Sequence, residues 1–157
     1  MEGLNETNHS HINLINSSGL LFICPGQSHS RKKQGSRQRQ TALNYIEGWY
    51  SGDAVRMEKA LHPDLAKRGI WIDRKTSKTV ITPLTAEKLV EYTKQGGGKK
   101  PKDQWNIEVT ILDMLENSAS VKIVSVDFID YAHVAKVDGE WKLLNVLWEP
   151  VKRKAKE

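Results

Sequence analysis

Residues 119–150, ASVKIVSVDFIDYAHVAKVDGEWKLLNVLWEP, decide the fold that this chain adopts. Within them, residues 119–126, 129–137 and 141–148 each show the period of two that is typical of a β-strand. The dipeptide Asp138-Gly139 separates the second and third segments, and it is favoured in two-residue type I′ turns. The stretch therefore predicts three consecutive antiparallel strands.

The alternation also divides the polar side chains of these strands between two faces. Tyr131 and His133 share one face of the second strand, and Asp130 lies on the other. Asn145 of the third strand falls roughly opposite His133 across the turn, one residue off strict register. We therefore expect Tyr131, His133 and Asn145 to converge, with Tyr45 or Trp49 of a helix above them.

The size and charge of the chain indicate one domain with a nearly neutral body. The 157 residues suffice for a single hydrophobic core. Five Arg/Lys and two Glu lie in residues 1–39, and four Arg/Lys and one Glu in 151–157. Residues 40–150 hold the other fifteen basic and sixteen acidic residues, so a basic groove for nucleic acid is not supported.

The two ends are expected to be tails. Residues 1–36 are rich in Asn, Ser, His and Gln without periodicity, which predicts a disordered leader, and 151–157 is a short basic tail. The ordered domain is then 37–150. Cys24 is the only cysteine, which favours a reducing, cytoplasmic setting, and no run approaches the roughly eighteen apolar residues of a membrane span.

The middle of the chain predicts helices and short strands. Apolar residues at helical spacing predict a helix up to Tyr50, and Asp53 caps a second, short helix. Residues 69–73 and 79–82 follow as short strands, and Thr85 caps a third helix over 86–94. The strand that begins at 105 slips in register near residues 111–113, which predicts a β-bulge. The order favours an α+β fold, with a curved antiparallel sheet wrapped around three N-terminal helices.

Four segments carry a family resemblance that covers roughly residues 38–149. They are YIEGWYSGD (45–53), ALHPDLAKR (60–68), FIDYAHV (128–134) and DGEWKLLNVLW (138–148). The chain resembles the nuclear-transport-factor-two-like superfamily (cystatin-like fold), and within it the subgroup labelled putative lumazine-binding. The resemblance implies a cone with a pocket between the sheet and the helices. Superfamily members include ketosteroid-isomerase-like and polyketide-cyclase-like enzymes, dehydratases, ligand carriers and dimerisation modules, so the fold does not fix the function.

The candidate site combines general acid/base residues with aromatic ones. We expect catalytic roles for His62, His133, Asp130 and Tyr131, because a carboxylate-oriented imidazole can move protons at neutral pH. The residues expected to contact a ligand are Tyr45, Trp49, Asn145 and Trp148. A structural polar cluster is the alternative interpretation. A metal site would need His62, His133 and Asp130 to meet, and neither a metal nor a cofactor is expected.

These observations leave two classes of function open. The first is a pocket that binds a small organic molecule and acts as a metal-independent lyase or isomerase. The second is a non-catalytic ligand-binding or dimerisation module. We also expect a homodimer through the outer face of the sheet. Nucleic-acid binding through the basic tails ranks last.

Overall fold

The computed structural model describes residues 26–151, and the side chains of residues 35–151. Most of the leader expected at 1–36, and the basic tail after Val151, lie outside the described residues. The elements, in chain order, are α1 (Gly26–Ser51), α2 (Ala54–Ala60), β1 (Leu61–Ile72), β2 (Thr79–Leu84), α3 (Ala86–Lys94), the short 3-10 helix η1 (Lys102–Gln104), β3 (Glu108–Met114), β4 (Ser118–Val124), β5 (Phe128–Val137) and β6 (Glu140–Pro150). The first helix begins upstream of residue 37, where the sequence predicts that order begins. None of the described helices is long and apolar enough to cross a membrane.

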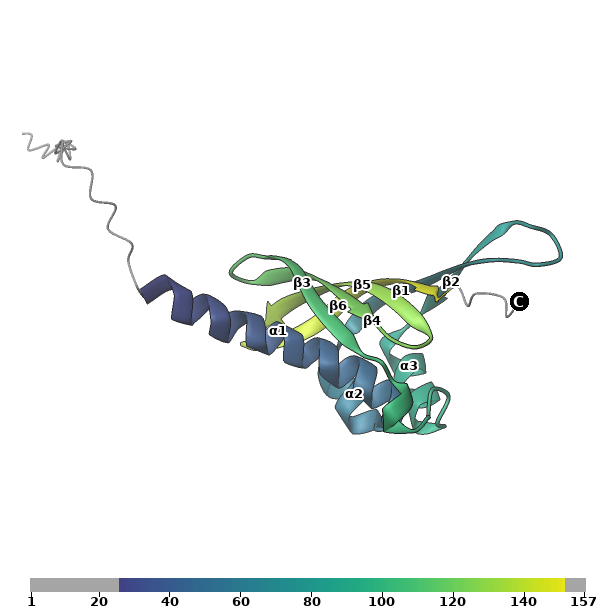
Figure 1. Ribbon diagram of the computed structural model, residues 1–157, viewed down its shortest axis with the longest axis horizontal. Coiled ribbons are helices and arrows are strands. Elements are labelled where there is room, and N and C mark those ends of the chain that lie inside the picture. The colour runs from purple at the N-terminus through teal and green to yellow at the C-terminus, as the bar shows by residue number, and fades with distance from the viewer. Residues whose placement is uncertain (1–25, 152–157) are drawn as a thin grey trace, which may run out of the picture.

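Six strands form one curved sheet in the order β2-β1-β6-β5-β4-β3. In Figure 1, α1, α2 and α3 all lie on the same side of this sheet, and the β1–β2 hairpin extends from one end. The predicted α+β class is confirmed, but the expectation of a wholly antiparallel sheet is wrong, because β1 and β6 run parallel. No hairpin joins these two strands, so the connection between them does not impose opposite directions.

The local signals for helix ends are confirmed. The Asp53 carboxylate accepts a hydrogen bond from the Arg56 N–H at 2.9 Å, and the Thr85 hydroxyl accepts one from the Lys88 N–H at 3.3 Å. Gly52, which follows α1, has a φ of 74°. These caps satisfy N–H groups that a helix cannot pair internally, and they fix where α2 and α3 begin.

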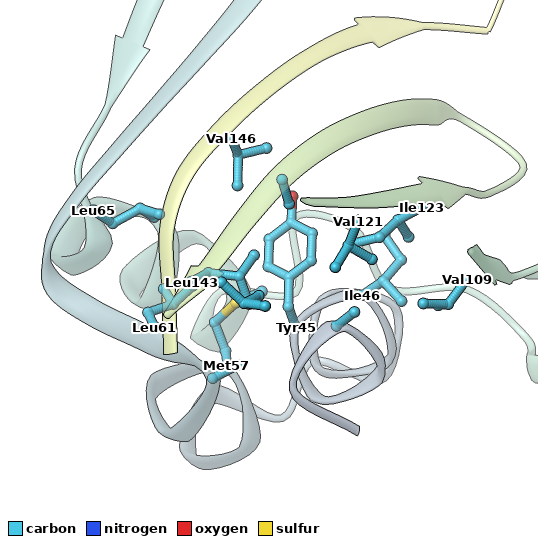
Figure 2. Packing of buried hydrophobic residues seen from close by; sticks show 14 of the residues in the cluster. Tyr45, Ile46, Met57, Leu61, Leu65, Val109, Val121, Ile123, Leu143 and Val146 are labelled. Atoms are coloured by element: carbon cyan, nitrogen blue, oxygen red, sulfur yellow. The ribbon is translucent and has the colours of Figure 1, made fainter. Parts of the chain in front are cut away.

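The core lies between α1 and the inner face of the sheet. Figure 2 shows the Tyr45 ring rising from α1, with Leu143 and Val146 on one side of it and Val121 and Ile123 on the other. The largest of the fully buried apolar side chains are Tyr50, Ile46, Met57, Ile123, Leu143, Val121 and Val134. Because α1 covers one face only, the other face of β4, β5 and β6 is left exposed.

The register of the sheet shifts between Leu61 and Ala66 where β1 pairs with β6, and two β-bulges lie in other strand pairs. The first lies between Ile111 and Asp113 of β3, as the register slip in the sequence predicts. The second lies in β6, where Leu143 pairs with Val134 and Asn145 pairs with His133, so that Leu144 is an extra residue. This bulge explains the one-residue offset seen in the sequence.

The second bulge corrects the predicted faces of β6. A regular strand would place Asn145 with Trp141 and Leu143, and Trp148 on the opposite side. In the structure Trp141, Leu143 and Val146 are buried, whereas Asn145 is exposed. The extra residue at 144 shifts the alternation by one position, and Trp148 therefore lies on the inner face.

A glycine in β1 makes room for Trp148. Gly69 is buried, and a Cβ atom built on it would lie 2.5 Å from the Trp148 ring. Gly35 in α1 has ordinary space, because its Cβ would lie 3.6 Å from the Ile111 side chain.

We expect Gly69→Ala to lower the free energy of unfolding by about 1–3 kcal/mol, the usual cost of overpacking a core. The matched change Gly35→Ala should raise it by up to about 1 kcal/mol, because alanine is the better helix former. Urea unfolding followed by tryptophan fluorescence measures both values. Equal effects of the two substitutions would show that β1 and Trp148 do not pack in this way.

Candidate functional site

A cavity of about 280 Å³ lies between the helices and the inner face of the sheet. Aromatic and aliphatic side chains from α1, α3, β2, β5 and β6 form most of its wall, together with Lys67 of β1. The lining residues are Tyr45, Ile46, Trp49, Lys67, Thr82, Leu84, Leu89, Tyr92, Phe128 and Trp148. Among them, Lys67 is the only residue with a charged side chain.

Lys67 belongs to a buried polar cluster at the cavity wall. Its Nζ donates to Asp130 Oδ1 at 2.9 Å and to Tyr45 Oη at 2.6 Å. The Tyr45 hydroxyl in turn donates to Asp130 Oδ1 at 2.8 Å. Nζ also lies 5.2 Å from the ring centroids of both Tyr45 and Trp148, within the range of cation–π attraction. The cluster therefore joins α1, β1 and β5 at one point.

The register of the sheet brings these residues together. Lys67 pairs with Val146 and Asp130 pairs with Trp148, so β6 runs between the two charged residues. All four positions lie on the inner face, because alternate residues of a strand share a face. The Lys67–Asp130 ion pair therefore crosses over β6 towards the helices.

Burial dominates the electrostatics of the cluster. The Lys67 side chain is 7% exposed and that of Asp130 is 1% exposed. Loss of water lowers the pKa of Lys67 below its usual 10.5, and the Asp130 carboxylate opposes this shift. The Lys67 amine binds its proton more tightly in the unfolded chain than in the folded one. The contribution of Lys67 to stability therefore rises with pH in the range just below 10.5. Burial, and then Asp130, raise the pKa of the Tyr45 hydroxyl well above 10.0.

One oxygen of the buried Asp130 carboxylate has no hydrogen-bond partner among the described residues. Asp130 Oδ2 is inaccessible to solvent and accepts no hydrogen bond from any described residue. Buried polar atoms are nearly always paired, so an oxygen without a partner next to a buried amine is unusual.

The structure places three of the residues expected to contact a ligand at this cavity. Tyr45, Trp49 and Trp148 all contribute to its wall. Asp130, expected to act in catalysis, lies behind the wall and reaches it through Lys67 and Tyr45. Their roles in binding or catalysis stay predictions.

Tyr131, His133 and Asn145 lie on the opposite face of the sheet, and the expectation that they converge beneath Tyr45 or Trp49 is wrong. His133 and Asn145 do pair across the turn, but all three are exposed, Tyr131 by 51%. The period of two separates the faces of a strand without indicating which one is inside. That is decided by α1, which covers the face of Asp130.

His62 lies at the start of β1 and is not among the residues that line the cavity. Its Nδ1 accepts a hydrogen bond from the Asp64 N–H at 3.1 Å, which holds the ring against the next residues of β1. The described residues contain no group of three His, Cys, Asp or Glu side chains that could hold a metal ion. His62, His133 and Asp130 therefore do not meet.

Sequence reasoning missed Lys67, because His62-Pro63-Asp64 resembles the end of a helix followed by a loop. The structure instead continues β1 through this segment, from Leu61. In the structure Leu65, Lys67 and Gly69 are all buried and alternate with exposed or half-buried residues, but a lysine and a glycine give this inner face no apolar pattern in the sequence. A lysine at an inward position of a strand is rare and marks a site.

The glycine-rich loop 96–98, which follows α3, packs against Trp49. A Cβ atom on Gly98 would overlap the Trp49 indole nitrogen, and one on Gly97 would lie 3.2 Å from the ring. The loop therefore holds one wall of the cavity in place, and only a backbone without side chains fits there.

We expect Lys67→Met and Asp130→Asn each to lower the free energy of unfolding by about 3–5 kcal/mol, since each leaves a buried partner unpaired. The double variant should cost less than the sum of the two. The exposed pair Lys142–Glu140 supplies the control, and Lys142→Met should cost less than about 1 kcal/mol. Urea unfolding measures all four variants, and additive costs for the buried pair would show that the two residues do not interact.

Comparisons with known proteins agree on the fold. No curated protein matches the chain in sequence. An NTF2-like protein of unknown function from Shewanella baltica is 17% identical, with a TM-score of 0.58 over 78% of this chain and 97% of that one. An NTF-2 like protein of unknown function from Silicibacter pomeroyi is 9% identical, with a TM-score of 0.64 over 76% and 98%. A protein of unknown function with a cystatin-like fold from Nostoc punctiforme is 14% identical, with a TM-score of 0.52 over 74% of this chain and 90% of that one.

The predicted cone fold is therefore confirmed, with three helices against a curved, unclosed sheet. The family model described as "Putative lumazine-binding" matches residues 36–149, which is most of the chain. This agrees with the resemblance carried by the four sequence segments. The chain therefore belongs to the family described as putative lumazine-binding, and it has the fold of NTF2-like and cystatin-like proteins.

Proposed function

We propose that this protein binds a small, flat organic molecule in the cavity between α1, α3 and the inner face of the sheet. The observation that carries the proposal is the buried Lys67 ammonium in a wall that is otherwise uncharged and mostly aromatic or aliphatic. Binding pockets typically combine an apolar lining with a few polar groups that orient the ligand.

The wall suggests the chemistry of the ligand. Tyr45, Trp49, Phe128 and Trp148 offer ring faces and edges that suit a planar molecule. The Lys67 ammonium has three N–H donors, and it uses two of them in hydrogen bonds to Tyr45 and Asp130. The third is available to an acceptor atom of the ligand. The volume lies near the lower limit for drug-sized ligands, so a compound of one or two rings fits best.

Lumazine is a candidate ligand because the family description names it. It is a flat, two-ring pteridine that carries carbonyl oxygens. The aromatic wall would stack on its rings, and the Lys67 ammonium would donate to a carbonyl oxygen. The proposal covers other flat carbonyl compounds on the same grounds.

A metal-independent lyase or isomerase is the catalytic form of the proposal. Lys67 would stabilise negative charge that develops on a ligand oxygen when a neighbouring proton is removed. Asp130, hydrogen-bonded to both Lys67 and Tyr45, would hold the donors in place. Reversible binding without reaction is the non-catalytic form, and the same residues support it.

We expect lumazine to quench the tryptophan fluorescence of the full-length protein in a saturable way. Lys67→Met should weaken binding about ten- to one-hundred-fold, the usual effect of losing a hydrogen bond from a charged donor. Lys122→Met removes the same charge from the outer face of β4 and should leave binding unchanged. His133→Ala, also on that face, should be equally silent. If Lys67→Met binds like the wild type, the cavity is not the site.

We propose a second function, self-association through the outer face of the sheet, because apolar side chains gather there. Tyr131 and Leu147 pair across β5 and β6 and are 51% and 45% exposed. Arg68 and Lys122 flank them on the adjoining strands. A sheet with one uncovered, partly apolar face is suited to pairing with a second copy.

We expect the wild-type protein to sediment as a dimer and Leu147→Asp to sediment as a monomer, since a buried, unpaired carboxylate opposes association. Val55→Asp on α2 changes an equally apolar, 77% exposed position away from the sheet and should remain dimeric. Sedimentation velocity at several concentrations distinguishes the two states. A monomeric wild-type protein would remove this second function and leave the ligand proposal intact.

A further inference from the structure

We infer that Lys67 binds carbonyl compounds covalently, with its amine forming an imine with an aldehyde or ketone that enters the cavity. This inference rests on the proposed function, because it names the ligand class and the bond formed at the same site. It differs from the proposal in assigning Lys67 a nucleophilic role in addition to that of a hydrogen-bond donor.

The position of the amine supports the inference. Lys67 is a cavity-lining residue, and its Nζ lies equally far, 5.2 Å, from the ring centroids of two other lining residues, Tyr45 and Trp148. A planar carbonyl compound that stacks on these rings brings its carbonyl carbon to the amine. Hydrogen bonds to Tyr45 and Asp130 fix the nitrogen, which lowers the entropic cost of reaching the bonding geometry.

The surroundings of the amine favour its reactive form. A lysine acts as a nucleophile only after losing a proton, and burial in an apolar wall disfavours the charged ammonium. The direction of the Lys67 pKa, below its usual value, agrees with this environment. The 7% exposure of the side chain also limits access of water, which would hydrolyse an imine.

The neighbouring groups can balance the protons of the reaction. The Lys67 ammonium passes one proton to the Asp130 carboxylate, at 2.9 Å, and the free amine attacks the carbonyl carbon. A new C–N bond forms, the carbonyl π bond breaks, and one proton of the attacking amine moves to the carbonyl oxygen, which becomes the hydroxyl of a carbinolamine. The proton held by Asp130 then returns to this hydroxyl, the C–O bond breaks, and one water leaves. A protonated imine remains, paired with the Asp130 carboxylate as the ammonium was before.

The chain contains a second lysine that tests whether the cavity matters. Lys100 also pairs with a carboxylate, Asp127, and its Nζ lies 5.1 Å from the ring centroid of Tyr50. Lys100 does not line the cavity described above. Each of the two lysines thus has its own carboxylate and its own tyrosine ring as neighbours, and only Lys67 lines the cavity.

The test treats the full-length protein with naphthaldehyde and sodium borohydride, which reduces an imine to a stable amine. Peptide mapping by mass spectrometry then locates the added naphthylmethyl group. We expect Lys67 to carry more label than Lys100, and its labelling to reach half-maximum at a lower pH than that of N-acetyl-lysine amide. Lys67→Arg should reduce labelling to the background of the remaining lysines, and Lys100→Arg should leave the Lys67 label unchanged.

Naphthylmethanol, which cannot form an imine, separates this inference from the proposed function. If the alcohol binds and Lys67 is labelled no more than Lys100, the covalent role is overturned and the binding proposal stands. If neither the alcohol binds nor Lys67 is labelled, both are overturned. Because Lys67→Arg could unfold the chain, the ratio of Lys67 to Lys100 label in the wild-type protein decides the result without any variant.

Discussion

The buried contact of Lys67, Asp130 and Tyr45 ties the sheet to the helix that covers it. Two charges at this depth lose most of their hydration, and only close pairing with additional hydrogen bonds offsets that loss. The contact therefore holds β1 and β5 at a fixed separation across β6 and fixes the height of α1 above them. It constrains the arrangement more than it stabilises it, because an apolar replacement of the pair would bury surface at a lower electrostatic cost.

The same contact explains why a cavity exists at this end of the cone. A lysine whose ammonium must remain next to a carboxylate cannot fold back to fill the space in front of it. Gly69 lets the Trp148 ring approach β1 closely, and the 96–98 loop lets Trp49 lie against backbone. Two large rings are thus kept at the wall by residues without side chains. The shape of the cavity therefore depends on glycines, although glycine usually destabilises a strand.

Much of the fold was predictable from the sequence, because its signals are local. The Asp138-Gly139 turn, with φ angles of 50° and 85°, and the caps at Asp53 and Thr85 depend on a few neighbouring residues. The site was less predictable, since it depends on contacts between distant residues. The alternation in β5 separates Asp130 from Tyr131 and His133, but only the packing of α1 makes the side of Asp130 the inside. Lys67 escaped notice because Pro63 and Asp64 suggest a loop, and β1 continues through them.

The bulge at Leu144 has a consequence for how this chain can change in length. The residue is extra: without it, Asn145 would follow Leu143 directly, and the regular alternation would still place Val146 and Trp148 inside. Deletion of Leu144 is therefore compatible with both surfaces of the sheet, although the strand would lose its bend. Deletion of Asn145 would remove the bulge in the same way, with Leu144 in the outward place of Asn145, whereas deletion of Val146 or Leu147 would turn Asn145 inward or exchange the two faces beyond the deletion. A deletion in β6 is thus tolerated at the bulge, at Leu144 or Asn145, and the cone can alter its curvature there without exchanging its inner lining for its outer surface.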